Sequence, residues 1–167
     1  KISHDHIEWI RNIDYLGFDD FPKALALDND ENIYISGEGG KSTGEKDIFL
    51  TKYSPTGDLT WQKSYASHES PSEAVPTKLL VTNSGDVFLA GWVKTETSGR
   101  DFILLMYSKD GHLFIDKKYS GGTFSDDIPT DMKLVGDQTL HLTGTSLGSN
   151  SKYNVLRYDF FKTDSSI

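Results

Sequence analysis

The sequence predicts an all-β fold, and three observations support this prediction. Short apolar segments rich in Ile, Val, Leu, Tyr, Phe and Trp recur in one order three times along the 167 residues. Clusters of Gly, Pro, Asn, Asp and Ser separate these segments, and such residues favour turns. Apolar residues nowhere recur at helical spacing over ~11 positions or more. We therefore expect strands joined by turns and no helices.

Four blocks make up each repeat. Gly37, Gly91 and Gly144 close one of them and are 54 and 53 residues apart. Pro22, Pro76 and Pro129 of another block have the same spacing. The repeated blocks are Trp9–Ile13, Trp61–Tyr65 and Ile115–Tyr119; Phe21–Leu27, Val75–Val81 and Ile128–Leu134; Asn32–Gly37, Asp86–Gly91 and Thr139–Gly144; and Asp47–Tyr53, Asp101–Tyr107 and Lys152–Tyr158.

Each block has the length and composition of a strand. We expect the repeated glycines where a strand ends and the chain approaches its neighbour closely. Four strands per repeat at a period near ~50 residues are typical of β-propeller blades. We therefore predict a β-propeller-like chain of three four-stranded antiparallel blades, a partial or half ring. The predicted parts are an N-terminal segment 1–6, blades 7–58, 59–112 and 113–159, and a C-terminal tail 160–167.

The repeats resemble the SBBP family of bacterial β-propeller repeats. Asp28 to Gly37, Asp47 to Lys52 and Pro55-Thr56-Gly57 of the first repeat follow the family's pattern. The second repeat follows it through Gly85, Gly91, Asp101 and Gly111, whereas the third has a shorter turn at Gly136-Asp137 and Lys152 in place of the Asp. The resemblance covers residues 7–159. It implies a binding or scaffold module in the periplasm or at the surface of a bacterial cell, and it carries over no catalytic residue.

Three blades are too few for a closed ring, because propellers have ~4–8 blades. An open end would expose a hydrophobic sheet face and unpaired strand edges. The chain could be a piece of a longer protein that holds the other blades. It could also be a half-ring that a homodimer completes, or an independent three-sheet fold. We expect its partner to be another protein, the remaining blades of its own propeller, or a second copy.

The candidate binding residues lie in two sets of long loops, which a four-stranded meander would place on one face. Loops presented by a rigid scaffold commonly carry function. The loops that lead into the first strand of each repeat are acidic, and Trp92 begins a long loop where it could anchor a partner. The candidate binding residues are Asp19, Asp20, Glu69, Glu73, Trp92, Asp126 and Asp127. Alternatively, these acidic residues only keep the loops soluble.

Metal and catalytic motifs are weak. Asp28, Asp30 and Asn32 have the spacing that opens a calcium loop, but Ile33 and Gly39 stand where that motif requires Gly and Glu. We therefore interpret the segment as a turn. His141 occupies the slot of Tyr34 and Phe88, so we expect it to pack in a strand.

Composition excludes several functions. The formal net charge of −8 argues against nucleic-acid binding, and the absence of cysteine excludes disulfides and thiolate chemistry. No apolar run is long enough for a membrane helix, and no cofactor is predicted. We expect a non-catalytic, extracytoplasmic binding module. The alternative is an extracytoplasmic hydrolase or lyase that acts on a glycan or peptide through acidic residues at the propeller face.

Overall fold

The computed structural model describes residues 7–41, 44–66, 72–95, 99–122, 125–136, 138–147 and 152–159. These residues form strands and turns, which confirms the all-β prediction. None of them forms a helix with the length and hydropathy that a bilayer span requires. The strands are β1 (Asp20–Leu27), β2 (Ile33–Gly40), β3 (Lys46–Tyr53), β4 (Leu59–Tyr65), β5 (Ser72–Val81), β6 (Val87–Thr95), β7 (Arg100–Tyr107), β8 (Leu113–Tyr119), β9 (Asp126–Val135), β10 (Thr139–Leu147) and β11 (Lys152–Asp159).

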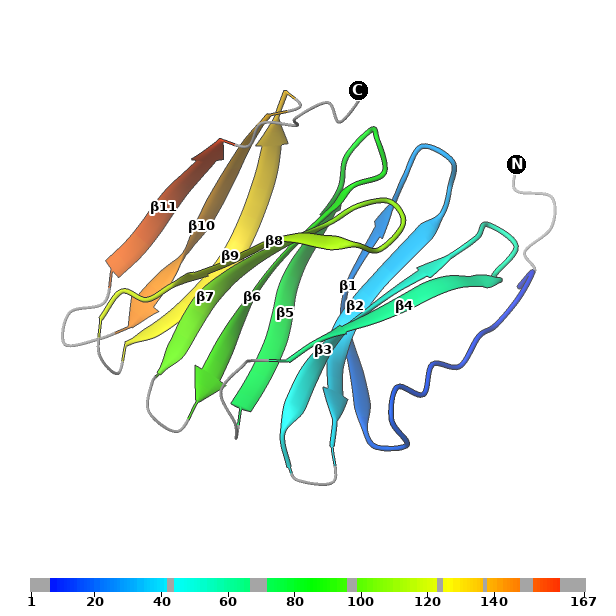
Figure 1. Cartoon of the computed structure of the whole chain (residues 1–167), viewed down its shortest axis with the longest axis horizontal. Coiled ribbons are helices and arrows are strands. Elements are labelled where there is room, and N and C mark those ends of the chain that lie inside the picture. The colour runs from blue at the N-terminus through cyan, green and yellow to red at the C-terminus, as the bar shows by residue number, and fades with distance from the viewer. Residues whose placement is uncertain are drawn as a thin grey trace.

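The strands belong to two sheets, seen side by side in Figure 1. β1–β4 form an antiparallel meander, and β5–β8 form a second one. A parallel pairing of β3 with β5, at Lys46 and Glu73, joins the two meanders into one mixed sheet of eight strands. β9, β10 and β11 form a separate antiparallel three-stranded sheet.

The predicted β-propeller-like arrangement of three four-stranded blades, as a partial or half ring, is therefore wrong. The parallel pairing merges the first two meanders, and the third sheet has three described strands. The block Trp9–Ile13 was expected to be a strand and forms none. A repeated sequence predicts equivalent strands because each strand depends on its own side chains. How those strands join depends on backbone pairing between sheets, which the repeat does not encode.

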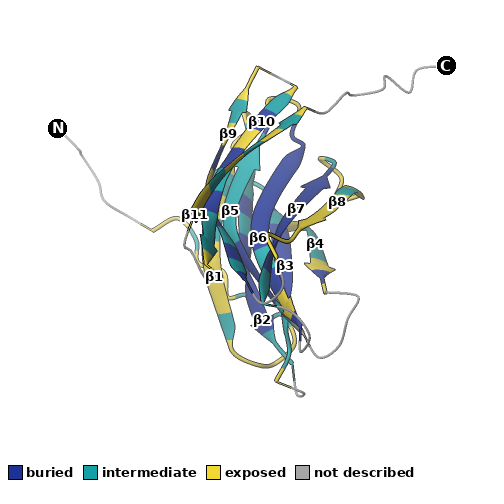
Figure 2. Ribbon diagram, turned by 90° about the vertical axis from the view of Figure 1, so that its left-hand side faces the viewer, coloured by how far each residue is buried: buried dark blue, intermediate teal, exposed yellow. Residues whose placement is uncertain are grey.

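Two hydrophobic clusters hold the sheets together. The first lies between the meanders and includes Tyr34, Ile48 and Leu50 on one side and Leu89 on the other. The second lies between the second meander and the three-stranded sheet and includes Phe88 and Leu142. β6 and β7 supply alternate side chains to both clusters, so both of their faces are buried. They are mostly dark blue in Figure 2.

The repeated glycines lie within β2, β6 and β10 rather than at strand ends, and close approach explains each of them. A Cβ atom at Gly37, Gly91 or Gly144 would lie 2.4, 2.5 or 2.4 Å from a backbone carbonyl oxygen of the preceding strand. Each of these strand pairs also carries a bulge or register shift there. The sequence-based prediction of close approach is confirmed. The larger side chain of any other residue would force the strands apart.

Candidate functional site

Of the predicted binding loops, the one before β1 lies wholly within the described residues. The loop before β1 meets the end of β2, where the Gly40 amide donates to the Asp19 carbonyl at 3.1 Å. The Asp20 carboxylate accepts the Tyr15 amide at 2.7 Å and so closes its own loop. Asp19 is exposed, whereas Asp20 is half-buried. Asp20 therefore shapes the loop in which it was expected to bind a partner.

Asp126 and Asp127 were expected in the corresponding loop, but they are the first two residues of β9. The two carboxylate oxygens of Asp126 accept the Arg100 amide at 2.9 Å and an Arg100 guanidinium nitrogen at 3.3 Å. Asp127 is fully buried, and its Oδ2 accepts the Gly121 amide at 2.6 Å and the Ser125 hydroxyl at 3.0 Å. The protein's own donors thus occupy both oxygens of Asp126 and one oxygen of Asp127, whose Oδ1 is buried without a hydrogen bond.

The remaining predicted residues add little to an acidic rim. Glu73 lies 3.7 Å from the Lys46 ammonium group, across the pairing of β3 with β5. Glu69 lies outside the described residues. Trp92 lies inside β6, not at the start of a loop, and the Arg100 guanidinium covers its ring at 4.7 Å. Of the described acidic candidates, Asp20, Glu73, Asp126 and Asp127 thus have partners within the chain, and Asp19 is the exposed one.

The segment considered for calcium is a tight turn. Oδ1 of Asp28 accepts the amides of Asp30 and Asn32 at 3.0 and 2.9 Å, and Oδ2 accepts the Tyr34 hydroxyl at 3.0 Å. Burial raises the pKa of Asp28, but the hydrogen bonds from Asn32, Tyr34 and Asp30 outweigh burial and leave this pKa below its ordinary value. Within the described ranges, no three His, Asp or Glu side chains lie close enough together to hold a metal ion.

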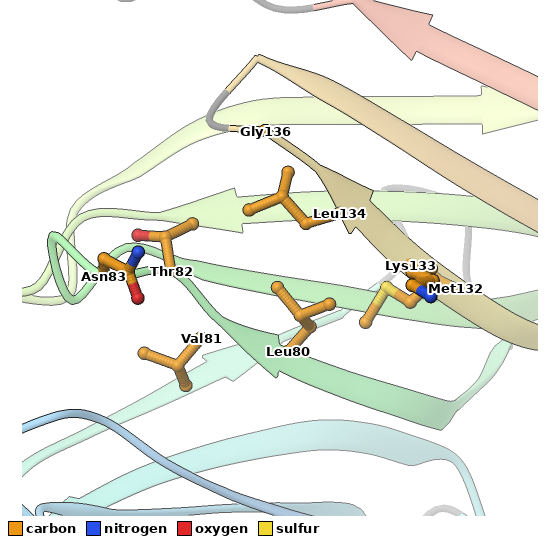
Figure 3. Close-up of a pocket in the computed structure, with 8 residues that line it drawn as sticks. All are labelled: Leu80, Val81, Thr82, Asn83, Met132, Lys133, Leu134 and Gly136. Atoms are coloured by element: carbon orange, nitrogen blue, oxygen red, sulfur yellow. The ribbon is translucent and has the colours of Figure 1, made fainter.

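Two cavities lie between the second meander and the three-stranded sheet. One of about 430 Å³ lies near the ends of β5 and β9, where Leu80 and Leu134 line it together with Asn83 and Lys133 (Figure 3). The other has about 240 Å³ and lies beside β8 and β11. Its walls are mainly apolar and come from Phe102, Leu104, Leu142, Leu156 and Tyr158, with Tyr119 and the stems of Lys117, Lys118 and Arg157.

The smaller cavity adjoins a free strand edge. Within the described residues β11 pairs with β10 and with no strand on its other side. The second meander shows what its fourth strand, β8, does at the equivalent place. Tyr65 of β4 is 9% exposed, and its hydroxyl donates to Asp116 of β8 at 3.1 Å. The equivalent Tyr119 of β8, beside the uncovered edge of β11, is 42% exposed.

The sequence analysis expected unpaired strand edges at an open end but did not consider one as a binding site, although two signals pointed to β11. The third repeat lacks a recognisable fourth block after Tyr158. The strand Lys152–Asp159 also mixes polar residues among its apolar ones, whereas the equivalent β7 is apolar from Phe102 to Tyr107. A run that is apolar throughout is typical of a strand buried on both faces, whereas a mixed one is typical of a strand with one buried face. Those signals identify β11 as a strand with an open face.

The comparisons with known proteins add no assignment. The chain matches no protein-family model, and none of the curated proteins compared with it matches. The candidate site therefore stands on geometry: the free edge of β11, the adjoining apolar cavity and the exposed phenol of Tyr119.

Proposed function

We propose that the chain is a non-catalytic protein-binding module that takes up an extended segment of a partner along the free edge of β11. The observation that carries the proposal is the pairing of that edge with an apolar cavity of about 240 Å³. In strand addition, backbone hydrogen bonds to an exposed edge supply affinity, and pockets for alternate side chains supply specificity. β11 offers both an exposed edge and an adjoining pocket.

The place of action remains the prediction from the resemblance to SBBP repeats: the periplasm or the surface of a bacterial cell. The alternative of a hydrolase or lyase depends on free carboxylates at the loop edge. Asp126 and Asp127 are engaged by Arg100, Gly121 and Ser125. The geometry therefore favours binding over catalysis.

A random peptide library displayed on phage, selected against the immobilised chain, tests the proposal. We expect enrichment of peptides that alternate apolar and polar residues, because alternate side chains of an added strand enter the cavity. Leu156→Asp puts a charge into the cavity wall and should abolish capture. Phe114→Asp on β8 is the control, because Phe114 is 52% exposed and does not line the cavity.

Circular dichroism and urea unfolding must show that both variants fold. If Leu156→Asp fails to fold, Lys117→Glu and Arg157→Glu at the cavity rim replace it, since both side chains are exposed and alter the rim without entering the core. Equal capture by the rim variants and the parent chain would contradict the proposed site. So would a selection that enriches no peptide.

A further inference from the structure

The junction between the two meanders and the junction between the second meander and the three-stranded sheet are built in the same way. At the first, Leu79 and Val81 of β5 pack on the cluster that contains Ile48 and Leu50 of the first meander. At the second, the equivalent residues of β9, Met132 and Leu134, pack on the cluster of Phe102 and Leu104. In each case the first strand of the later unit packs two apolar side chains on the face of the meander before it.

β1 carries two equivalent apolar side chains, but no sheet lies against them in the described part of the chain. Leu25 and Leu27 occupy the positions of Leu79 and Val81 in the repeat and are 63% and 56% exposed. We call these two residues the β1 ridge. Their alternate neighbours, Ala24 and Ala26, are half-buried, so one face of the strand is covered and the other is open.

The opposite end of the molecule carries the matching face. Tyr153 and Val155 of β11 occupy the positions of Phe102 and Leu104, and they are 82% and 69% exposed. At the two internal junctions the equivalent residues are at most 5% exposed. We call Tyr153 and Val155 the β11 face. The ridge and the face are therefore the two halves of a junction that this chain makes twice within itself.

A second contact repeats in the same way. The Trp61 indole of β4 donates to the Lys109 carbonyl at 3.0 Å and lies over Gly111 in the turn before β8. The Trp9 indole donates to the Pro55 carbonyl at 3.1 Å and lies over Gly57 in the turn before β4. Segment 7–13 thus takes the place of an outer strand next to the first meander, but it has no strand partner.

We propose that a second copy of this chain is the occupant of the β11 edge and that the copies bind head to tail. Segment 7–13 of one copy lies along the edge of β11 of the other and supplies its outer strand, and the β1 ridge covers the β11 face. The inference rests on the proposed function, since it names the partner for the same edge.

Charge supports this pairing. The sheet that receives the ridge exposes the basic Lys133, Lys152 and Arg157 against the acidic Asp131 and Asp159, so its exposed charge is positive. Residues 7–19, which precede β1, hold the acidic Glu8, Asp14 and Asp19 against one base, Arg11. Opposite charges on the two surfaces favour encounter in this orientation, and added salt weakens that attraction.

Sedimentation velocity over a concentration series tests the inference on the full chain. The parent should shift from monomer to larger species as concentration rises. Two variants each remove one half of the contact: Leu25→Asp with Leu27→Asp on the ridge, and Tyr153→Asp with Val155→Asp on the face. Each variant alone should stay monomeric, because in a heterologous contact every interface needs one ridge and one face. Phe114→Asp, on an exposed site of β8, is the matched control and should associate like the parent.

Mixing the two variants is the decisive measurement. A mixture still contains one intact ridge and one intact face, so it should form a complex of one copy of each and nothing larger. Asn12→Pro in segment 7–13 removes a backbone donor from the added strand and should weaken association of the parent without lowering its stability as a monomer.

A parent that stays monomeric at every concentration overturns the inference, and so does a mixture that stays monomeric. Variants that still self-associate would show a different contact and would overturn it as well. These outcomes are separable from failure of the proposed function. Peptide capture that depends on Leu156, by a chain that never self-associates, would retain the binding edge and reject only the second copy as its occupant.

Discussion

The second meander and the three-stranded sheet carry the same repeat in different surroundings. Phe88, Phe102 and Leu104 of β6 and β7 are at most 5% exposed, because the three-stranded sheet covers them. At the equivalent positions His141 is exposed, and Tyr153 and Val155 are 82% and 69% exposed. The prediction that His141 packs like its equivalents is therefore wrong. A position in a repeat is buried only when the next sheet covers it.

The largest expected difference in stability is between equivalent substitutions in these two regions. Phe88→Ala should lower the free energy of unfolding by ~3–5 kcal/mol, because it empties a fully buried site between two sheets. His141→Ala at the equivalent exposed position should change it by ~0.5 kcal/mol or less. Urea unfolding of both variants measures the difference. Similar losses in the two variants would show that the face of the three-stranded sheet is covered in solution.

Trp61 and Trp9 occupy equivalent positions and allow a second comparison of a covered and an uncovered side chain. Both indoles donate to a turn carbonyl, but Trp61 also packs on the first cluster and meets the Tyr34 ring edge-on at 5.9 Å. Trp61→Ala should therefore cost ~3 kcal/mol of stability, and Trp9→Ala less than ~1 kcal/mol. Midpoints of urea unfolding test the order. A larger loss for Trp9→Ala would contradict the placement of segment 7–13.

Two buried tyrosines of the first cluster predict that the chain loses stability at high pH. Burial raises the pKa of Tyr107, and burial followed by the nearby Asp116 carboxylate raises that of Tyr65. A group whose pKa is higher in the folded state than in the unfolded state contributes its full stability below the unfolded pKa. That contribution is lost as the pH rises from the unfolded pKa through the folded pKa. Stability should therefore fall above pH ~10. Tyr107→Phe should flatten this fall in urea titrations at successive pH values, and an unchanged slope would argue against the role of Tyr107.

The smallest effect concerns four equivalent turns. Gly57, Gly85 and Gly111 have φ of 79°, 83° and 81°, whereas Glu31 occupies the same turn position with φ of 62°. A side chain is strained in this left-handed region, so Glu31→Gly should stabilise the chain by about 1 kcal/mol. Gly85→Ala, the reverse change in the second meander, should destabilise it by a similar amount. Thermal unfolding measures both, and a loss of stability in Glu31→Gly would show that the Glu31 side chain has a compensating contact.

Much of the local structure could be predicted from the sequence. Turn residues and β-branched blocks located β1 to β11, and the repeated glycines indicated the close approach that Gly91 makes to Val75. The candidate site was harder to predict. Asp126 and Asp127 were expected in a loop, but they are the first two residues of β9. Their hydrogen bonds to Arg100 and Gly121 come from folded backbone geometry, which composition does not report.

The sequence by itself determined where β1 to β11 form, because each strand depends on the side chains of a few neighbouring residues. It did not determine that the block Trp9–Ile13 forms no strand. Only the tertiary structure decided that Lys46 and Glu73 join two meanders in one mixed sheet. It also decided that Phe102 is covered while its equivalent Tyr153 is open. Burial depends on which surfaces meet. Equivalent side chains therefore differ in exposure according to whether another sheet lies against them.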